Sequence, residues 1–156
     1  MYFADRKWLK WHKDDPEFKA FKGQKITQFH DENCKKELIE DCQKHNIKML
    51  ESIDASGLSE SPDFIHQGSN SGYQAINLAY LMGAKKIILL GYDMQFTDGK
   101  AHWFGEHPDE IRSGYDGFIK KFNKMAEHMP KGLEIINCTR KTALNCFPIK
   151  KLEEVL

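Results

Sequence analysis

Residues 71–93 read SGYQAINLAYLMGAKKIILLGYD, and this stretch decides the fold. Its first half predicts a helix over residues 71–82 with apolar side chains on nearly every face, which is typical of a buried helix. Gly83 follows at the position where glycine commonly ends a helix. Residues 86–90 are a short apolar run, typical of a parallel strand covered on both faces.

The same alternation of strand and helix patterns extends to both sides of this stretch. Asp31 is expected to cap a helix over residues 33–44, where apolar side chains recur every three or four positions. The other expected strands are 1–5, 25–29, 47–53 and 133–138, and the other expected helices are 6–13, 108–129 and 152–156. Strands that alternate with helices predict a right-handed parallel α/β sheet, here in a single domain of residues 1–156.

Composition excludes several classes of protein. The 156 residues contain 23 Lys and Arg against 23 Asp and Glu, which argues against binding nucleic acid by bulk charge. The longest apolar run is far shorter than a membrane span, and the N-terminus has no apolar signal-peptide region. The spacing of the four cysteines matches no zinc pattern, so we expect reduced thiols in a cytoplasmic protein.

Ligands of parallel α/β sheets bind beyond the carboxyl ends of the strands. Three polar loops follow predicted strands, at residues 54–71, 91–107 and 138–145, and we expect them to converge at one edge of the sheet.

The first loop ends in Gly68, Ser69, Asn70, Ser71 and Gly72 and opens directly into a helix. Free backbone N–H groups at a helix start favour an anion, so this cluster predicts contact with a phosphate or a sugar. The alternative is that one Ser or Asn simply caps the helix.

The second loop carries Asp93, Asp98, His102 and His107. A histidine titrates near neutral pH and is a candidate general base, and two histidines with carboxylates are also a possible metal site. The structural alternative is that Asp93 only bonds the backbone of its own turn.

The third loop offers Asn137, Thr139 and Thr142 as candidate substrate-binding residues, and Arg140 and Lys141 as partners for a negative ligand. The alternatives are that a threonine caps the following turn and that the two cations are ordinary surface charges.

Residues 68–105, GSNSGYQAINLAYLMGAKKIILLGYDMQFTDGKAHWFG, and residues 137–147, NCTRKTALNCF, carry a family resemblance. They resemble the domain shared by Maf-type flagellin glycosyltransferases and MptE-like 6-hydroxymethylpterin pyrophosphokinases, and are also similar to bacterial sialyltransferases that use CMP-sialic acid. The resemblance covers residues 68–107 and 133–147. It implies a Rossmann-like three-layer sandwich with a mainly parallel sheet.

The resemblance also implies roles for individual residues. His107 would be the general base, with His102 as its rival, and Asp93 would brace the loop. Ser71 and Gly72 would contact a nucleotide-sugar donor.

Two departures from the family pattern are visible. Met94, Gln95 and Phe96 stand where the sialyltransferases have tyrosines that hold the donor phosphate. No Gly-x-Gly-Pro-Ser loop precedes the matched region, so the usual first βαβ unit is missing. A short phage-type member of the family, or a fragment, is the expected explanation.

Three functions therefore remain open. The first is a glycosyltransferase-like protein that binds a nucleotide sugar of the CMP type and needs no metal cofactor. The second is a pyrophosphokinase-like enzyme that uses ATP with Mg²⁺ near Asp93 and Asp98. The third is a non-catalytic phage binding or assembly protein on the same scaffold. The missing first strands would leave an open sheet edge, which predicts a homo-oligomer.

Overall fold

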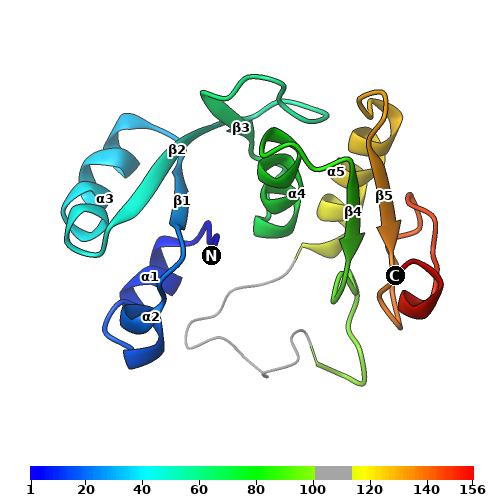
Figure 1. Ribbon diagram of the computed structural model, residues 1–156, viewed down its shortest axis with the longest axis horizontal. Helices are drawn as coiled ribbons and strands as arrows, with labels where there is room; N and C mark the ends of the chain where they lie inside the picture. Colours follow the sequence, from blue (N-terminus) through cyan, green and yellow to red (C-terminus); the bar gives the residue numbers. More distant parts are fainter. Residues whose placement is uncertain (101–113) are drawn as a thin grey trace. The chain divides into compact units, whose positions relative to one another are not determined.

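The computed structural model describes residues 1–100 and 114–156 (Figure 1). The chain divides into two compact units. Unit 1 comprises residues 1–55 and 59–81, and unit 2 comprises residues 56–58 and 82–156.

Unit 1 contains a three-stranded parallel sheet in the order β1-β2-β3. The strands are β1 (Lys25–Phe29), β2 (Ile47–Ile53) and β3 (Phe64–His66). On the other side of β1, Tyr2 forms a single parallel bridge with Ile26. The expected strand at residues 1–5 is therefore reduced to one bridge, whereas the predicted bounds of β1 and β2 are confirmed.

The helices of unit 1 are α1 (Arg6–His12), α2 (Pro16–Ala20), α3 (Glu32–Lys44) and α4 (Ser71–Leu81). Asp31 caps α3 as predicted, because its carboxylate accepts a hydrogen bond from the backbone N–H of Cys34 at 2.8 Å. That hydrogen bond holds the pKa of Asp31 below its usual range. The helices bury one apolar cluster against the sheet, composed of Phe3, Leu9, Phe18, Leu38, Cys42 and Ile47.

Strand β3 corrects the sequence-based prediction of an uninterrupted loop over residues 54–71. It pairs with the end of β2, with Ile65 opposite Ser52. Three residues are too few to show an alternating pattern, so this strand is set by its neighbour and not by its own sequence.

Unit 2 contains two parallel strands, β4 (Lys86–Leu89) and β5 (Glu134–Asn137), whose arrows run in the same direction in Figure 1. Ile149 adds a single parallel bridge to Asn137 on the other side of β5. A short 3₁₀ helix, η1 (Leu152–Glu154), follows near the C-terminus.

Helix α5 (Tyr115–Glu127) precedes β5 and buries Phe122 and Met125. The predicted helix was longer, from residue 108 to 129. The part of that prediction before residue 114 lies outside the described residues, and the helix ends two residues before the predicted end.

The expected α/β class and parallel pairing are confirmed, in two small sheets of three and two strands. Within residues 1–100 and 114–156, no helix has the length and apolar character needed to cross a bilayer. All four cysteines are free thiols, and burial raises the pKa of Cys42 and of Cys146 to about 11.

Candidate functional site

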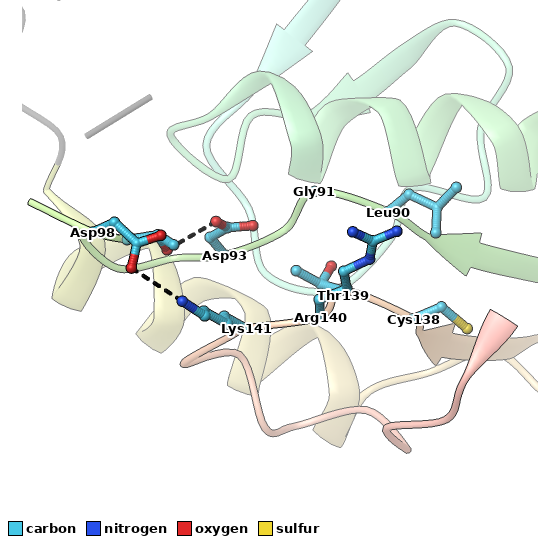
Figure 2. Close-up of a pocket in the computed structure, with 9 residues that line it drawn as sticks. Leu90, Gly91, Asp93, Asp98, Cys138, Thr139, Arg140 and Lys141 are labelled. Atoms are coloured by element: carbon cyan, nitrogen blue, oxygen red, sulfur yellow. Dashed lines mark hydrogen bonds and ion pairs between the residues drawn. The ribbon is translucent and has the colours of Figure 1, made fainter. Parts of the chain in front are cut away.

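A pocket of about 390 Å³ lies beyond the carboxyl ends of β4 and β5 (Figure 2). We call it the loop pocket, because the loops that follow the two strands line it. Its polar wall consists of Asp93, Thr97, Asp98, Thr139, Arg140 and Lys141. In unit 2, therefore, polar groups from the second and third predicted loops come together at the expected edge.

The loop after β4 forms the acidic side of this pocket. The Asp93 carboxylate accepts a hydrogen bond from the Thr97 hydroxyl at 2.9 Å. Thr97 and Lys100 exchange two backbone hydrogen bonds around Asp98 and Gly99, whose φ angles are +52° and +77°. Positive φ at both central residues is the geometry that an Asp-Gly pair favours in a tight hairpin turn. The expectation that Asp93 braces its own loop agrees with these contacts.

The loop after β5 is tied to the loop after β4 by two threonines. The Thr139 hydroxyl accepts a hydrogen bond from the backbone N–H of Tyr92 at 2.9 Å. The Thr142 hydroxyl donates to the backbone carbonyl of the same Tyr92 at 2.7 Å. The N–H of Ala143 donates to the carbonyl of Asp93 at 2.8 Å. These bonds fix the distance between the two walls of the loop pocket.

Asn137 anchors the same arrangement from inside unit 2. Its side chain is 0% exposed; the amide oxygen accepts from the N–H of Thr139 at 3.0 Å, and the amide nitrogen donates to the carbonyl of Leu144 at 3.0 Å. Asn137 and Thr142 do not line the loop pocket, whereas Thr139 does. Their observed contacts are with protein groups, and their contact with a substrate stays a prediction.

The two walls carry opposite charges. Lys141 Nζ and Asp98 Oδ1 are 3.0 Å apart in an exposed ion pair (Figure 2). Arg140 is different: among the described residues its guanidinium has no hydrogen bond or ion pair. Figure 2 draws its side chain between Asp93 and Leu90, which line the same pocket. Within residues 1–100 and 114–156, Arg140 is therefore a cation of the loop pocket that is available to a ligand.

Burial also affects the phenol of Tyr92, in the loop after β4. The Tyr92 ring contacts Phe122 edge to face at a centroid distance of 6.0 Å. This burial raises the pKa of Tyr92 to about 12, so its hydroxyl stays neutral at physiological pH.

The first predicted loop, apart from residues 56–58, belongs to unit 1, where Asn70 caps α4. Its side-chain oxygen accepts from the N–H of Tyr73 at 2.8 Å, and its amide nitrogen donates to the carbonyl of Gly68 at 3.1 Å. This contact confirms the capping alternative for Asn70. Ser69 and Ser71 are exposed, and their anion binding stays a prediction.

Gly68 is required by close packing. Its φ is +52°, and a Cβ there would lie 2.0 Å from the ring of Tyr73, which is fully buried. Gly72, in the first turn of α4, is half-buried. Gly68 thus has a packing role in unit 1 that needs no ligand.

The predicted catalytic histidines, His102 and His107, lie outside the described residues. Within residues 1–100 and 114–156, no group of three His, Cys, Asp or Glu side chains is arranged to hold a metal ion.

The sequence analysis did not identify Thr97 as a candidate site residue. The signal for it was available, because Asp98-Gly99 predicts a tight turn that sets the preceding residue against Asp93.

Comparison with known proteins adds no further support: no family model, curated protein or solved structure matches this chain. The resemblance in residues 68–107 and 133–147 therefore remains a prediction, and the geometry of the loop pocket carries the functional argument.

Proposed function

We propose that this protein binds a nucleotide sugar of the CMP type in the loop pocket and transfers the sugar to an acceptor hydroxyl. The observation that carries the proposal is Arg140, a guanidinium without a partner among the described residues, in a pocket at the carboxyl ends of two parallel strands. Such pockets are the usual ligand sites of α/β sheets. Arginine binds phosphate oxygens through two parallel N–H bonds, so a phosphate is the ligand group that suits it.

The remaining groups of the pocket suit a sugar. Asp93, Thr97 and Thr139 offer carboxylate and hydroxyl groups in the same pocket. Sugar hydroxyls both donate and accept hydrogen bonds, so these groups complement them. The family resemblance adds a proton acceptor, His107 or its rival His102. General-base catalysis of this kind typically contributes about 10²–10⁴-fold in rate.

The proposal retains two expectations from the sequence. The Rossmann-like three-layer sandwich is supported by the parallel pairing within each unit. Homo-oligomer formation rests on the sequence, and light scattering at tens of micromolar measures it.

Calorimetry with CMP and with CMP-sugars tests the proposal. We expect millimolar or tighter binding, and Arg140→Ala should weaken it about tenfold or more through loss of a charge-assisted contact. Lys131→Ala is the matched control, because Lys131 is an exposed cation of unit 2 that does not line the loop pocket. Absence of binding at millimolar CMP and CMP-sugar would contradict the proposal.

Transfer is tested separately from binding. His107→Ala should abolish sugar transfer while CMP affinity is retained. If His102 is the general base instead, His102→Ala should have this effect. Donor binding without transfer to any hydroxyl acceptor would favour the non-catalytic alternative, a phage binding or assembly protein.

One observation favours a second candidate, an ATP-dependent pyrophosphokinase. Asp93 and Asp98 line the same pocket, and Mg²⁺ is usually held by one or two carboxylates together with substrate phosphates. The donor set therefore fits Mg²⁺ with ATP. ATP binding that requires magnesium would support this candidate, and indifference to magnesium would count against it.

A further inference from the structure

A second and larger hollow adjoins the loop pocket. It has a volume of about 670 Å³ and lies between the ends of β4 and β5 and residues 149–154 near the C-terminus. We call it the tail pocket. The two pockets share Leu90, Cys138, Thr139 and Arg140. Both volumes fall within the roughly 300–1,000 Å³ that is typical of small-molecule sites.

The unshared walls of the two pockets differ in chemistry. The loop pocket adds mainly carboxylate, hydroxyl and ammonium groups, from Asp93, Thr97, Asp98 and Lys141. The tail pocket adds the aliphatic Ile149 and Leu152. Leu90 is 58% exposed and Ile149 is 53% exposed, so this pocket carries aliphatic surface that a ligand can cover. Covering apolar surface is favourable, at roughly 25 cal/mol per Å².

The tail pocket also carries charges, on Lys150, Lys151, Glu153 and Glu154. Among the described residues, neither lysine has a side-chain hydrogen bond or ion pair. The pocket therefore combines available cations with aliphatic surface, which suits an anionic ligand that has a flat apolar part.

The wall near the C-terminus is attached to the sheet by backbone and side-chain bonds. The N–H of Lys150 donates to the carbonyl of Asn137 at 3.1 Å, and Lys86 Nζ donates to the carbonyl of Val155 at 2.8 Å. These bonds tie residues 150–155 to both strands, so the tail pocket is formed without a ligand.

We propose that the donor is divided between the two pockets, with its nucleoside in the tail pocket, its phosphate on Arg140 and its sugar in the loop pocket. This inference rests on the proposed function. Arg140 belongs to both walls, so a phosphate bound there has one pocket on each side. The base takes the larger pocket because its flat face covers Leu90 and Ile149. The carboxylates of Glu153 and Glu154 accept hydrogen bonds from the ribose hydroxyls.

The experiment measures cytidine, CMP and CMP-sugar binding by calorimetry. Ile149→Glu removes aliphatic surface from the tail pocket and should weaken cytidine and CMP by similar factors, about tenfold, because the base loses apolar surface that it would cover. Leu156→Glu is the matched control, since Leu156 is an exposed aliphatic residue of the same segment that lines neither pocket. Thr97→Val, in the loop pocket alone, should leave CMP unchanged and weaken the CMP-sugar.

The outcomes distinguish a failure of the divided donor site from a failure of the proposed function. Normal CMP and cytidine affinity in Ile149→Glu would overturn the division of the donor, while CMP binding to the unchanged chain would still support the proposed function. No CMP binding to the unchanged chain would overturn both. Weaker CMP binding in Thr97→Val would also overturn the division, because it would put the nucleotide in the loop pocket.

Discussion

Two asparagines, one in each unit, hold a loop at the carboxyl end of a parallel strand. Asn77 of unit 1 and Asn137 of unit 2 are both 0% exposed. The Asn77 side chain accepts from the N–H groups of Ser59 and His66 and donates to the carbonyl of Ser59. Asn137 binds the loop after β5 in the same manner. Both buried amides are thus satisfied by hydrogen bonds to the loop that each one holds.

The two loops differ in which polar side chains remain available to a ligand. In unit 1 the Asn70 side chain is used to cap α4, and the Ser59 and Ser61 hydroxyls bond within their own loop. In unit 2 the threonines and Asn137 fix the walls, whereas Arg140 has no partner among the described residues. A polar loop is therefore not a ligand site by composition alone. A cation without a partner, held at the edge of a pocket, is the stronger indication.

The largest expected effect is on the stability of unit 1. Gly68→Ala should lower the free energy of unfolding by about 3 kcal/mol or more, because the new Cβ meets the Tyr73 ring at a positive φ. Gly83→Ala is the control, since φ there is +93° but no atom lies within 4 Å of a Cβ; its cost is about 1 kcal/mol. Urea unfolding measures both. Equal costs would show that the turn is not tightly packed.

The next effect distinguishes the two asparagines. Asn137→Ala and Asn77→Ala should each cost about 2–3 kcal/mol, because each leaves buried backbone groups without partners. Only Asn137→Ala should also weaken CMP, measured by calorimetry at a temperature where both variants are folded. Equal loss of CMP affinity in both variants would contradict the assignment of the ligand to unit 2.

A smaller effect is expected at Thr142, which bonds the Tyr92 carbonyl and so positions the pocket walls. Thr142→Val should cost about 1–2 kcal/mol in unfolding free energy and weaken CMP, because the carbonyl loses its donor. Thr142→Ser keeps the hydroxyl and should restore CMP affinity. A serine variant as weak as the valine variant would show that the methyl group, and not the hydrogen bond, matters.

The smallest effect is a pH dependence in unit 1. Burial is the main cause that lowers the pKa of His45 from 6.5, and the charge of Lys44 lowers this pKa further. The carboxylates of Asp41 and Asp14 act in the opposite direction and raise it. His45 Nε2 is buried without a hydrogen-bond partner in the described part of the chain.

The unfolded chain therefore binds this proton more tightly than the folded chain, and stability should fall as the pH drops below about 6.5. His45→Gln should reduce that slope in urea unfolding between pH 7 and pH 5. An unchanged slope in His45→Gln would reject the assignment.

Local sequence signals predicted the regular elements well. The predicted bounds of β1 and β2, and of α3 behind its Asp31 cap, agree with the structure to within a residue. Strand β3 was missed because its hydrogen bonds come from β2 and its loop is held by Asn77, which lies in the following helix.

For the candidate site, the sequence predicted the correct edge of the strands in unit 2 and the chemical types found there. It also singled out residues that line the loop pocket, among them Asp93, Thr139 and Arg140, but not Thr97. It did not predict that the Asn137 and Thr142 side chains bond the backbone of nearby loops, and their contact with a ligand stays a prediction.

The sequence by itself determined the α/β alternation, the caps and the turns, because these depend on residues within a few positions of one another. Only the tertiary structure decided which polar groups are satisfied internally and which remain at the pocket surface. That choice depends on hydrogen bonds between residues some 50 positions apart, such as Thr142 to Tyr92, and no local pattern records such a partner.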